Sequence, residues 1–510
     1  MRYSLGIDVG TTAVKAALIS ENKDVVVSEP YEYELIIPKQ DFVELDAEKY
    51  WQASKAVINE ILEKSKVKSE DIVAVSISSQ GETFVPLDEH NVPLRRAIVW
   101  LDNRSKEEAE EIKKEFRIQQ VYKITGQPEI LPTWTATKIL WLKKNEPEVF
   151  RKVKKYLLIE DYLIQKLTGK FVTDYSVLTS TLLFDIQKKV WWKQMLEFLE
   201  ISPDQLPEPK PSAHPVGKVS KKASGETGLS QNTIVSTGAF DHAASAVGTG
   251  NTQPGIVTEY TGSVLAVYAT TDKPIYYLPG KVPCHCHAVR DKYLLLLWCQ
   301  TAGSVLRWFR DNFCQVEKEM GSKLNLDPYD LMGLSAEKIP PGSEGLIILP
   351  HLLGAASPEF NPKAKGNIFG IGMHHSKAHF IRAIMESVAY MLRKNLEVLE
   401  EMKIKVKEIH SIGGGARSKL WTQIKSDVIK KPIRIRKMQE ASAIGAAILA
   451  GVGGGVFKSV QEGSRLIAGS EEEGTTPVPG NTKIYGASYR KYLQLYRSLE
   501  NMFNGSELDT

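Results

Sequence analysis

The sequence predicts an α/β protein with two related domains that face a shared cleft. Two stretches indicate this, because each reads as a strand, a turn rich in threonine, glycine or serine, and a second strand; they are residues 3–18 and 256–267. The length of 510 residues also exceeds what a single hydrophobic core usually accommodates. We therefore place a boundary between Gly248 and Ile256, with domains at 1–250 and 251–460 and a tail at 461–510 that carries one helix.

The first hairpin has residues suited to binding a phosphate. Apolar side chains alternate with polar ones on both sides of Gly10, which predicts two strands joined by a tight turn. Backbone N–H groups of this turn, with the hydroxyls of Thr11 and Thr12, can form a concave anion nest. Asp8 could hold Mg²⁺ through water, and Lys15 supplies a cation for phosphate charge. An ordinary hairpin with a polar turn explains the same residues equally well.

A buried strand over 72–77 leads into a polar loop at its carboxyl end, where open α/β sheets place ligands. In this loop Glu82 could accept hydrogen bonds from a polyol, and Gly81 leaves room for it. A solvated loop carboxylate is the simpler interpretation of Glu82 from these residues alone. The next strand ends in Asp102 and Arg104, which we expect to brace one another.

The strand over 233–237 leads into a segment of small residues that suits a helix packed tightly behind a site. Asp241 lies near the start of this helix, where its carboxylate could accept the proton of an attacking hydroxyl. A simple N-cap aspartate is the alternative. A helix start follows Ala302, and Arg307 on it could face a nucleotide.

Three consecutive glycines, 413–415, precede a further helical segment. A glycine turn that opens a helix lets a flat ring or a phosphate lie against bare backbone, although a flexible loop has the same composition. Amphipathic spacing predicts a long helix over about 379–402, and the alanine-rich stretch 441–450 predicts a helix in a tightly packed position.

Composition excludes several classes of protein. The net charge of +4 is nearly neutral for this length and does not favour nucleic acid as a partner. No apolar run reaches the roughly 18 residues of a membrane span, and no signal segment precedes the first strand. Four cysteines are too few for a disulfide framework, so a reducing cytoplasm is the simplest location. The run Cys284-His285-Cys286-His287 disfavours zinc, because alternation along a strand divides its side chains between two faces.

These motifs together resemble the FGGY family of carbohydrate kinases over about residues 3–455. The most specific element is Gly366-Asn367-Ile368-Phe369-Gly370-Ile371 followed, seven residues later, by the segment 379–386 (HFIRAIME), which fits the family's C-terminal signature. The segment 135–142 nearly matches the N-terminal signature and departs from it at Thr133.

The resemblance implies two ribonuclease-H-like domains of the actin-like ATPase type flanking a central cleft, with sugar bound mainly by the first domain and ATP by the second. It implies that Asp241 is the general base and Asp8 the Mg²⁺-organising carboxylate. Positions that match phosphate and nucleotide contacts are Thr11, Thr12, Lys15, Thr261, Gly262, Gly303, Arg307, Gly414 and Ser418. Positions that match sugar contacts are Gly81, Glu82, Thr133, Asp241 and His242.

This chain departs from the family's pattern at the positions that match sugar contacts. Glycerol kinases have arginine, tyrosine and glutamine where this chain has Gly81, Thr133 and His242, and xylulokinases have Met-His at 81–82 and Asn at 242. The smaller residues suggest a larger substrate than glycerol. We expect transfer of the γ-phosphoryl group of ATP to a primary hydroxyl of a ketose, with a pentulose such as xylulose favoured over L-fuculose, erythritol, glycerol or gluconate. A homodimer is compatible with the sequence.

An ATP-driven chaperone or filament protein is the main rival from another class, since it shares the nucleotide fold. Such proteins lack both the Asp241-His242 element and the C-terminal signature, so the sequence disfavours them. The absence of a Gly-x-x-x-x-Gly-Lys-Ser/Thr motif argues against a P-loop kinase.

Overall fold

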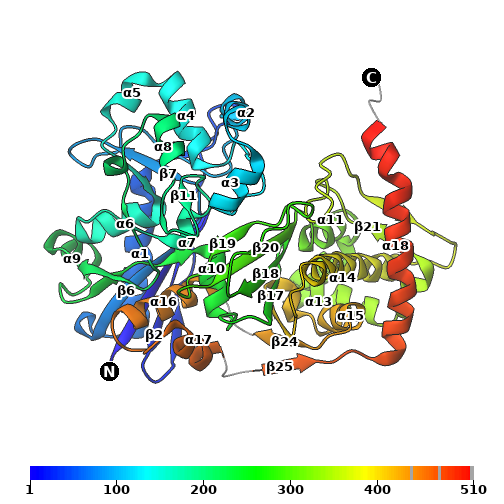
Figure 1. The fold of residues 1–510 in the computed structure, drawn as a ribbon. Helices are drawn as coiled ribbons and strands as arrows, with labels where there is room; N and C mark the ends of the chain where they lie inside the picture. The colour runs from blue at the N-terminus through cyan, green and yellow to red at the C-terminus, as the bar shows by residue number, and fades with distance from the viewer. Residues whose placement is uncertain (437–439, 469–471, 506–510) are drawn as a thin grey trace.

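Two large β-sheets, one in each of two lobes, organise the chain (Figure 1). The computed structural model describes residues 1–436, 440–468 and 472–505. The two lobes lie side by side, and helices cover the sheet of each one. The α/β class and the two-lobed architecture predicted from the sequence are therefore confirmed.

The first sheet is centred on strand β1 (Tyr3–Val9). It pairs antiparallel with β2 (Ala13–Ser20) and parallel with β6 (Ile72–Ser79), so Asp8 lies opposite both Lys15 and Ser78. The strand order is β14-β15-β6-β1-β2-β3, with β16 beside β6 and β4 beside β2. The remaining strands of this sheet are β3 (Val25–Val27), β4 (Tyr31–Glu32), β14 (Pro215–Lys218), β15 (Ile234–Ser236) and β16 (Ala239–Phe240).

The second sheet repeats this central arrangement. Strand β17 (Ile256–Thr261) pairs antiparallel with β18 (Leu265–Thr271) and parallel with β23 (Glu408–Ile412). Each sheet thus places a hairpin next to a parallel strand, which confirms the repeat inferred from the two hairpins. The other strands of this sheet are β19 (Cys284–Cys286), β20 (Tyr293–Cys299), β24 (Ile433–Arg436) and β25 (Glu472–Thr475).

Helices pack on both faces of the first sheet. Along β2, Ala16 and Leu18 share a core with α1 (Ala47–Ser65), which begins after the N-cap Asp46. Ala17 and Ile19 point to the opposite face and share a core with α16 (Ala441–Gly453). The other helices of the first lobe are α2 (Lys106–Glu115), α3 (Ile118–Thr125), α4 (Thr135–Asn145), α5 (Pro147–Lys152), α6 (Ile159–Thr168), α7 (Tyr175–Leu178), α8 (Lys193–Leu199), α9 (Lys221–Thr227), α10 (Asp241–Gly248) and α17 (Val460–Ala468).

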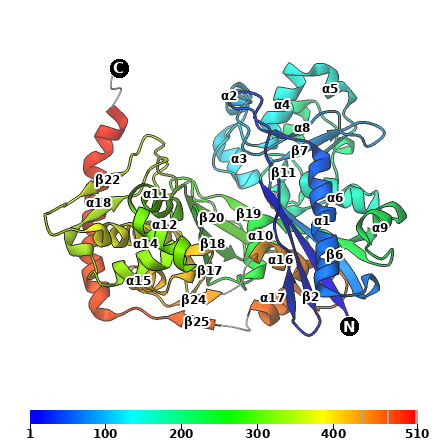
Figure 2. The same ribbon diagram turned by 180° about the vertical axis from the view of Figure 1, so that it is seen from behind.

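Helices α16 and α17 do not lie in the lobe that precedes them in the sequence. Both helices follow β24 of the second sheet, yet they lie on the first lobe in the two opposite views (Figures 1 and 2). A Cβ on Gly6 would overlap the backbone of α16, and a Cβ on Gly445 would overlap Ala244 of α10, so glycine permits this close approach. The segment predicted as the domain 251–460 therefore contributes a helix to the sheet of the other lobe.

The second lobe contains α14 (Lys377–Glu401), close to the predicted 379–402, and the C-terminal α18 (Pro479–Gly505) along its outer edge. Its other helices are α11 (Gly303–Phe313), α12 (Gln315–Leu324), α13 (Pro328–Glu337) and α15 (Lys419–Ile429). Short strands complete the two lobes: β5 (Glu44–Leu45), β7 (Phe84–Leu87), β8 (Ala97–Ile98), β9 (Lys155–Leu158), β10 (Val172–Asp174), β11 (Phe184–Asp185), β12 (Val190–Trp191), β13 (Glu208–Lys210), β21 (Ile347–Leu349) and β22 (Asn367–Phe369).

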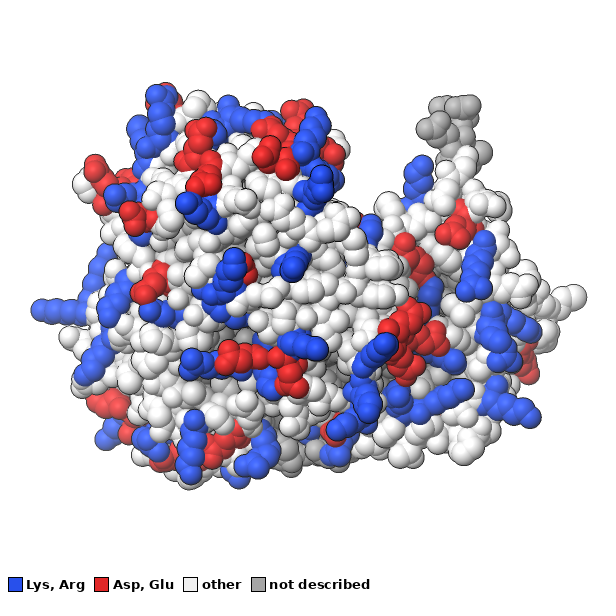
Figure 3. Space-filling view, in the orientation of Figure 1, with Lys and Arg blue, Asp and Glu red and all other residues white. Residues whose placement is uncertain are grey.

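The surface carries charges of both signs. On the face drawn in Figure 3, lysine and arginine side chains are interspersed with acidic ones, and neither sign covers a continuous area. Among the described residues, no helix has the length and apolar content needed to cross a membrane.

Candidate active site

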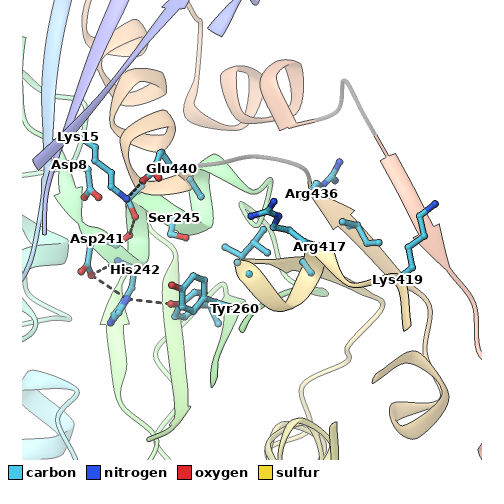
Figure 4. Close-up of a pocket in the computed structure, with 18 residues that line it drawn as sticks. Asp8, Lys15, Asp241, His242, Ser245, Tyr260, Arg417, Lys419, Arg436 and Glu440 are labelled. Atoms are coloured by element: carbon cyan, nitrogen blue, oxygen red, sulfur yellow. Dashed lines mark hydrogen bonds and ion pairs between the residues drawn. The ribbon is translucent and has the colours of Figure 1, made fainter. Parts of the chain in front are cut away.

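A cavity of about 990 Å³ lies between the two sheets and takes side chains from both lobes (Figure 4). Asp8, Asp241 and the Lys15–Glu440 pair lie at one end, whereas Arg417, Lys419 and Arg436 lie at the other. The described residues that line it are Asp8, Lys15, Asp241, His242, Ser245, Tyr260, Tyr268, Ile412, Gly413, Gly414, Ala416, Arg417, Lys419, Ile435, Arg436, Glu440, Ala441 and Ser442.

The first hairpin supplies a carboxylate and an ammonium group to this cavity. Asp8 Oδ1 accepts a 2.8 Å hydrogen bond from Ser78 Oγ on the neighbouring strand. Lys15 Nζ lies 2.7 Å from a carboxylate oxygen of Glu440, the residue that precedes α16. The cation predicted to face phosphate therefore forms an ion pair within the first lobe, with a glutamate that the sequence pattern did not single out.

Asp241 is the first residue of α10 and lies at the cavity wall, as the sequence predicts. Its Oδ1 accepts a 2.6 Å hydrogen bond from the backbone N–H of His242 and lies 3.2 Å from Nδ1 of the same residue. The same ring nitrogen lies 3.4 Å from the hydroxyl of Tyr268 on β18. About a third of the Asp241 side chain remains exposed, so its second oxygen can meet a ligand.

The loop after β6 places a second carboxylate near Asp241. Glu82 is 8% exposed and has a φ of 56°, a left-handed conformation that is uncommon outside glycine. Burial raises the pKa of Glu82, whereas the nearby ammonium of Lys138 lowers it and the Asp241 carboxylate raises it further. A Cβ on Gly81 would overlap the Ser180 hydroxyl, so this position accepts only glycine without movement. The interpretation of Glu82 as a solvated loop carboxylate is therefore wrong.

Lys138 is a buried lysine beneath the loop that contains Glu82. In the sequence it stood out only as a member of the signature segment 135–142. Its Nζ donates a 2.8 Å hydrogen bond to the carbonyl of Val99 and is fully enclosed. Burial lowers the pKa of Lys138, and the carboxylates of Asp102 and Glu82 raise it. Asp102 also bonds Arg104 through both oxygens, as predicted.

Trp100 is a further residue that the sequence pattern did not reveal. Its Nε1 donates a 2.9 Å hydrogen bond to Thr11 Oγ1, and its carbonyl accepts one of 2.5 Å from Thr133 Oγ1. The indole is 36% exposed. It therefore connects the first hairpin with the predicted sugar position at 133, and an aromatic ring there offers a flat surface to a sugar.

Three predicted nucleotide segments converge at the end of β17. The backbone N–H of Gly303 donates a 2.9 Å hydrogen bond to the carbonyl of Gly262. Gly413 has a φ of 84° and packs directly against the carbonyl of Thr261, and Gly415 packs against the Thr261 methyl group. The Thr261 hydroxyl points inward, where it bonds Glu259 and Lys425. Contact with a nucleotide would have to come from the backbone at 261–262.

The remaining predicted nucleotide residues have structural roles as well. Arg307 bonds the Ser263 hydroxyl at the tip of the second hairpin. Ser418 is the N-cap of α15, where its hydroxyl accepts a 3.3 Å bond from the N–H of Trp421. Arg417 and Lys419, which flank this cap, line the cavity. Their basic side chains beside a glycine turn are the sequence signal by which both residues could have been predicted.

The cavity thus unites part of the predicted set. Asp8, Lys15, Asp241, His242 and Gly414 all line it. The predicted residues that do not line it are Thr11, Thr12, Gly81, Glu82, Thr133, Thr261, Gly262, Gly303, Arg307 and Ser418.

Two family models match the chain. The N-terminal domain of the FGGY family of carbohydrate kinases matches residues 3–248, and the C-terminal domain of the same family matches residues 261–454. The chain belongs to the FGGY family of carbohydrate kinases.

Relatives of this FGGY kinase cover nearly its whole length. A gluconokinase from Bacillus subtilis is 34% identical over 98% of this chain and 97% of its own. A xylulose kinase from Lactococcus lactis is 30% identical, with the same coverage. The crystal structure of a xylulose kinase from Lactobacillus acidophilus has a TM-score of 0.89 at 27% identity and covers 99% of this chain and 100% of that one. The two-domain kinase fold implied by the sequence resemblance is confirmed.

The acidic end of the cavity in this FGGY kinase fits Mg²⁺. Burial and, next, the Asp241 carboxylate raise the pKa of Asp8 to about 7, because the charged form of Asp8 loses its hydration and faces a second negative charge. Among the described residues, no group of three or more His, Cys, Asp or Glu side chains is arranged to hold a metal. Mg²⁺ needs only one or two carboxylates when water and phosphate oxygens complete its shell, so Asp8 would suffice.

The pKa of Asp8 predicts how stability depends on pH. Between about pH 4 and pH 7 the folded FGGY kinase keeps a proton on Asp8 that the unfolded chain has lost, so this contribution to stability falls as pH rises. Asp8→Asn should therefore raise Tm relative to the wild type more at pH 8 than at pH 5, measured by thermal unfolding without Mg²⁺. An equal difference between the two chains at both pH values would contradict the prediction.

Proposed function

We propose that this FGGY kinase transfers the γ-phosphoryl group of ATP to a primary hydroxyl of a neutral ketose, with a pentulose such as xylulose as the first candidate. One observation carries the proposal: Asp241 opens α10 at a cavity wall, between the hairpin with Asp8 and Lys15 and the glycine turn with Gly414. We assign sugar binding mainly to the first lobe and nucleotide binding mainly to the second.

The chemistry follows from this arrangement. Asp241 accepts the proton of the sugar hydroxyl while the hydroxyl oxygen attacks the γ-phosphorus, and the bond from that phosphorus to the β-phosphate oxygen breaks to release ADP. His242 donates to Asp241 through its backbone and keeps the carboxylate aimed into the cavity. Lys15, once it exchanges Glu440 for phosphate, neutralises charge on the transferring group. A Mg²⁺ ion at Asp8 would supply further positive charge beside the phosphates.

The charge around the sugar position supports a neutral substrate. Asp241 places a carboxylate there, Glu82 adds a carboxyl group whose pKa burial raises to about 8, and the amine of Lys138 is enclosed and bound to the Val99 carbonyl. A carboxylate accepts hydrogen bonds from sugar hydroxyls, whereas it repels the carboxylate of a sugar acid. Gluconate is the second candidate, because the Bacillus subtilis relative at 34% identity is named a gluconokinase.

A substrate panel tests this proposal. ADP release should be measured with Mg·ATP and D-xylulose, L-xylulose, D-ribulose, L-fuculose, erythritol, glycerol or gluconate. We expect a ketose to give the highest kcat/KM, at least tenfold above gluconate, which corresponds to about 1.4 kcal/mol of discrimination. Highest activity with gluconate would replace the first candidate with the second. ADP release that no sugar accelerates would indicate an ATPase without sugar chemistry.

A further inference from the structure

A buried ionic cluster lies directly beneath the second hairpin. Lys425 of α15 has no exposed side-chain surface, and neither has Glu259 of β17, whose carboxylate oxygen lies 2.9 Å from Lys425 Nζ. The same ammonium donates a 2.9 Å hydrogen bond to Thr261 Oγ1. Ser411 of β23 donates to the other oxygen of Glu259, so the cluster joins two strands and a helix.

The fold itself does not require charges at this place. Removing two charges from water costs several kcal/mol per ion, and apolar residues of similar volume often serve a core equally well or better. Here the two partners satisfy one another and two hydroxyls, those of Thr261 and Ser411, all within the interior of the second lobe. A fully satisfied buried pair can rigidify the groups that it contacts, because each hydrogen bond restricts the rotation of its partner.

The group that the pair orients is Thr261. Its hydroxyl donates to Glu259 and accepts from Lys425, which determines the rotamer of the side chain and holds the backbone at the end of β17. That backbone is the surface against which the glycine turn packs at Gly413 and to which Gly303 of α11 donates. The ammonium of Lys425 also faces Gly415, so one cation supports both nucleotide loops from behind.

We propose that Lys425, through Glu259 and Thr261, is a positioning residue for the phosphoryl donor. The cluster holds the backbone of residues 261–262 and the turn at 413–417 in the relative position that binds the nucleotide. This inference rests on the proposed use of ATP and adds to it a residue that touches neither nucleotide nor sugar. The expected result of losing it is weaker nucleotide binding with unchanged affinity for the sugar.

Three variants separate positioning from stability. Lys425→Met leaves Glu259 buried without its cation, so both Tm and nucleotide affinity should fall. The double variant Glu259→Leu with Lys425→Met replaces both charges by apolar groups and should recover most of the lost Tm. Lys394→Met is the matched control, because Lys394 is another largely buried, ion-paired lysine of the second lobe that lies on α14; it should lower Tm without changing nucleotide affinity.

The measurement is calorimetric binding of Mg·ATP without sugar, together with KM for ATP and for the sugar. We expect the double variant to bind Mg·ATP with a Kd about 10- to 100-fold higher than that of the wild type. Its KM for the sugar should stay within about twofold of the wild-type value. If the double variant recovered both Tm and wild-type nucleotide affinity, Lys425 would be a purely structural residue and the inference would be overturned. If the wild type itself bound no Mg·ATP, the proposed function would fail, and this inference with it.

Discussion

Asp241→Asn is expected to lower kcat by about 10² to 10⁴ while the Kd for Mg·ATP stays near that of the wild type. An amide at this position keeps the size and the hydrogen bond from the His242 N–H, but it cannot accept a proton from the sugar hydroxyl. The glycine turn that we propose as the nucleotide contact lies beside Arg417 at the far end of the cavity, so nucleotide binding should be unaffected. Steady-state kinetics with the best sugar of the panel, and calorimetry with Mg·ATP, give the two quantities.

Asp46→Asn is the control for this experiment. Asp46 also begins a helix, since its carboxylate caps α1 by accepting from the N–H of Glu48 at 3.0 Å. Asparagine caps helices as well as aspartate, so kcat and Tm should both be retained. If Asp241→Asn kept full turnover, Asp241 would have no part in the proton transfer; a loss confined to Tm would indicate a role at the helix terminus alone.

Glu82→Gln is expected to lower kcat/KM for a ketose by about 10² to 10³ without changing nucleotide affinity. Glutamine has the same shape, but its amide loses the charge-assisted hydrogen bonds that a carboxylate accepts from hydroxyls. The same change removes an acid that becomes negatively charged only as the pH rises through about 8, so above that pH activity toward gluconate should rise or stay constant. The substrate panel applied to wild type and variant measures both effects.

The control for Glu82→Gln should be a residue without a structural role. The neighbouring Gln80 does not meet this condition, because its side chain donates a hydrogen bond to the carbonyl of Gly10 and so supports the first hairpin. The exposed Glu89 is the better control, since it lies in a surface turn after β7. Glu89→Gln should leave all kinetic constants unchanged. Equal losses of ketose and gluconate activity in Glu82→Gln would show that this carboxylate supports the loop and does not choose the substrate.

Local patterns in the sequence were sufficient to predict the parts of the site that lie on single elements. Alternation around Gly10 predicted the first hairpin, and small residues after Asp241 predicted the helix that begins there. Both signals are local, because strand pairing and helix starts depend on residues close in the chain. The same reasoning explains why Lys15 was expected at the cavity, since its register opposite Asp8 follows from the turn.

Contacts between distant segments could not be read from these patterns. An alanine-rich stretch indicates a tightly packed helix, but the packing surface of α16 on the first sheet depends on tertiary contact alone. Lysine is almost always solvated, so neither Lys138 nor Lys425 was expected in the interior. Glu440 reaches Lys15 only because α16 returns to the first lobe.

The return of α16 also means that neither half of the sequence is a self-sufficient unit. The polypeptide passes from one lobe to the other between Gly248 and Ile256, again between Arg436 and Ala441, and once more between Ala468 and Glu472. A fragment ending at residue 250 would leave the apolar face formed by Ala17 and Ile19 in water.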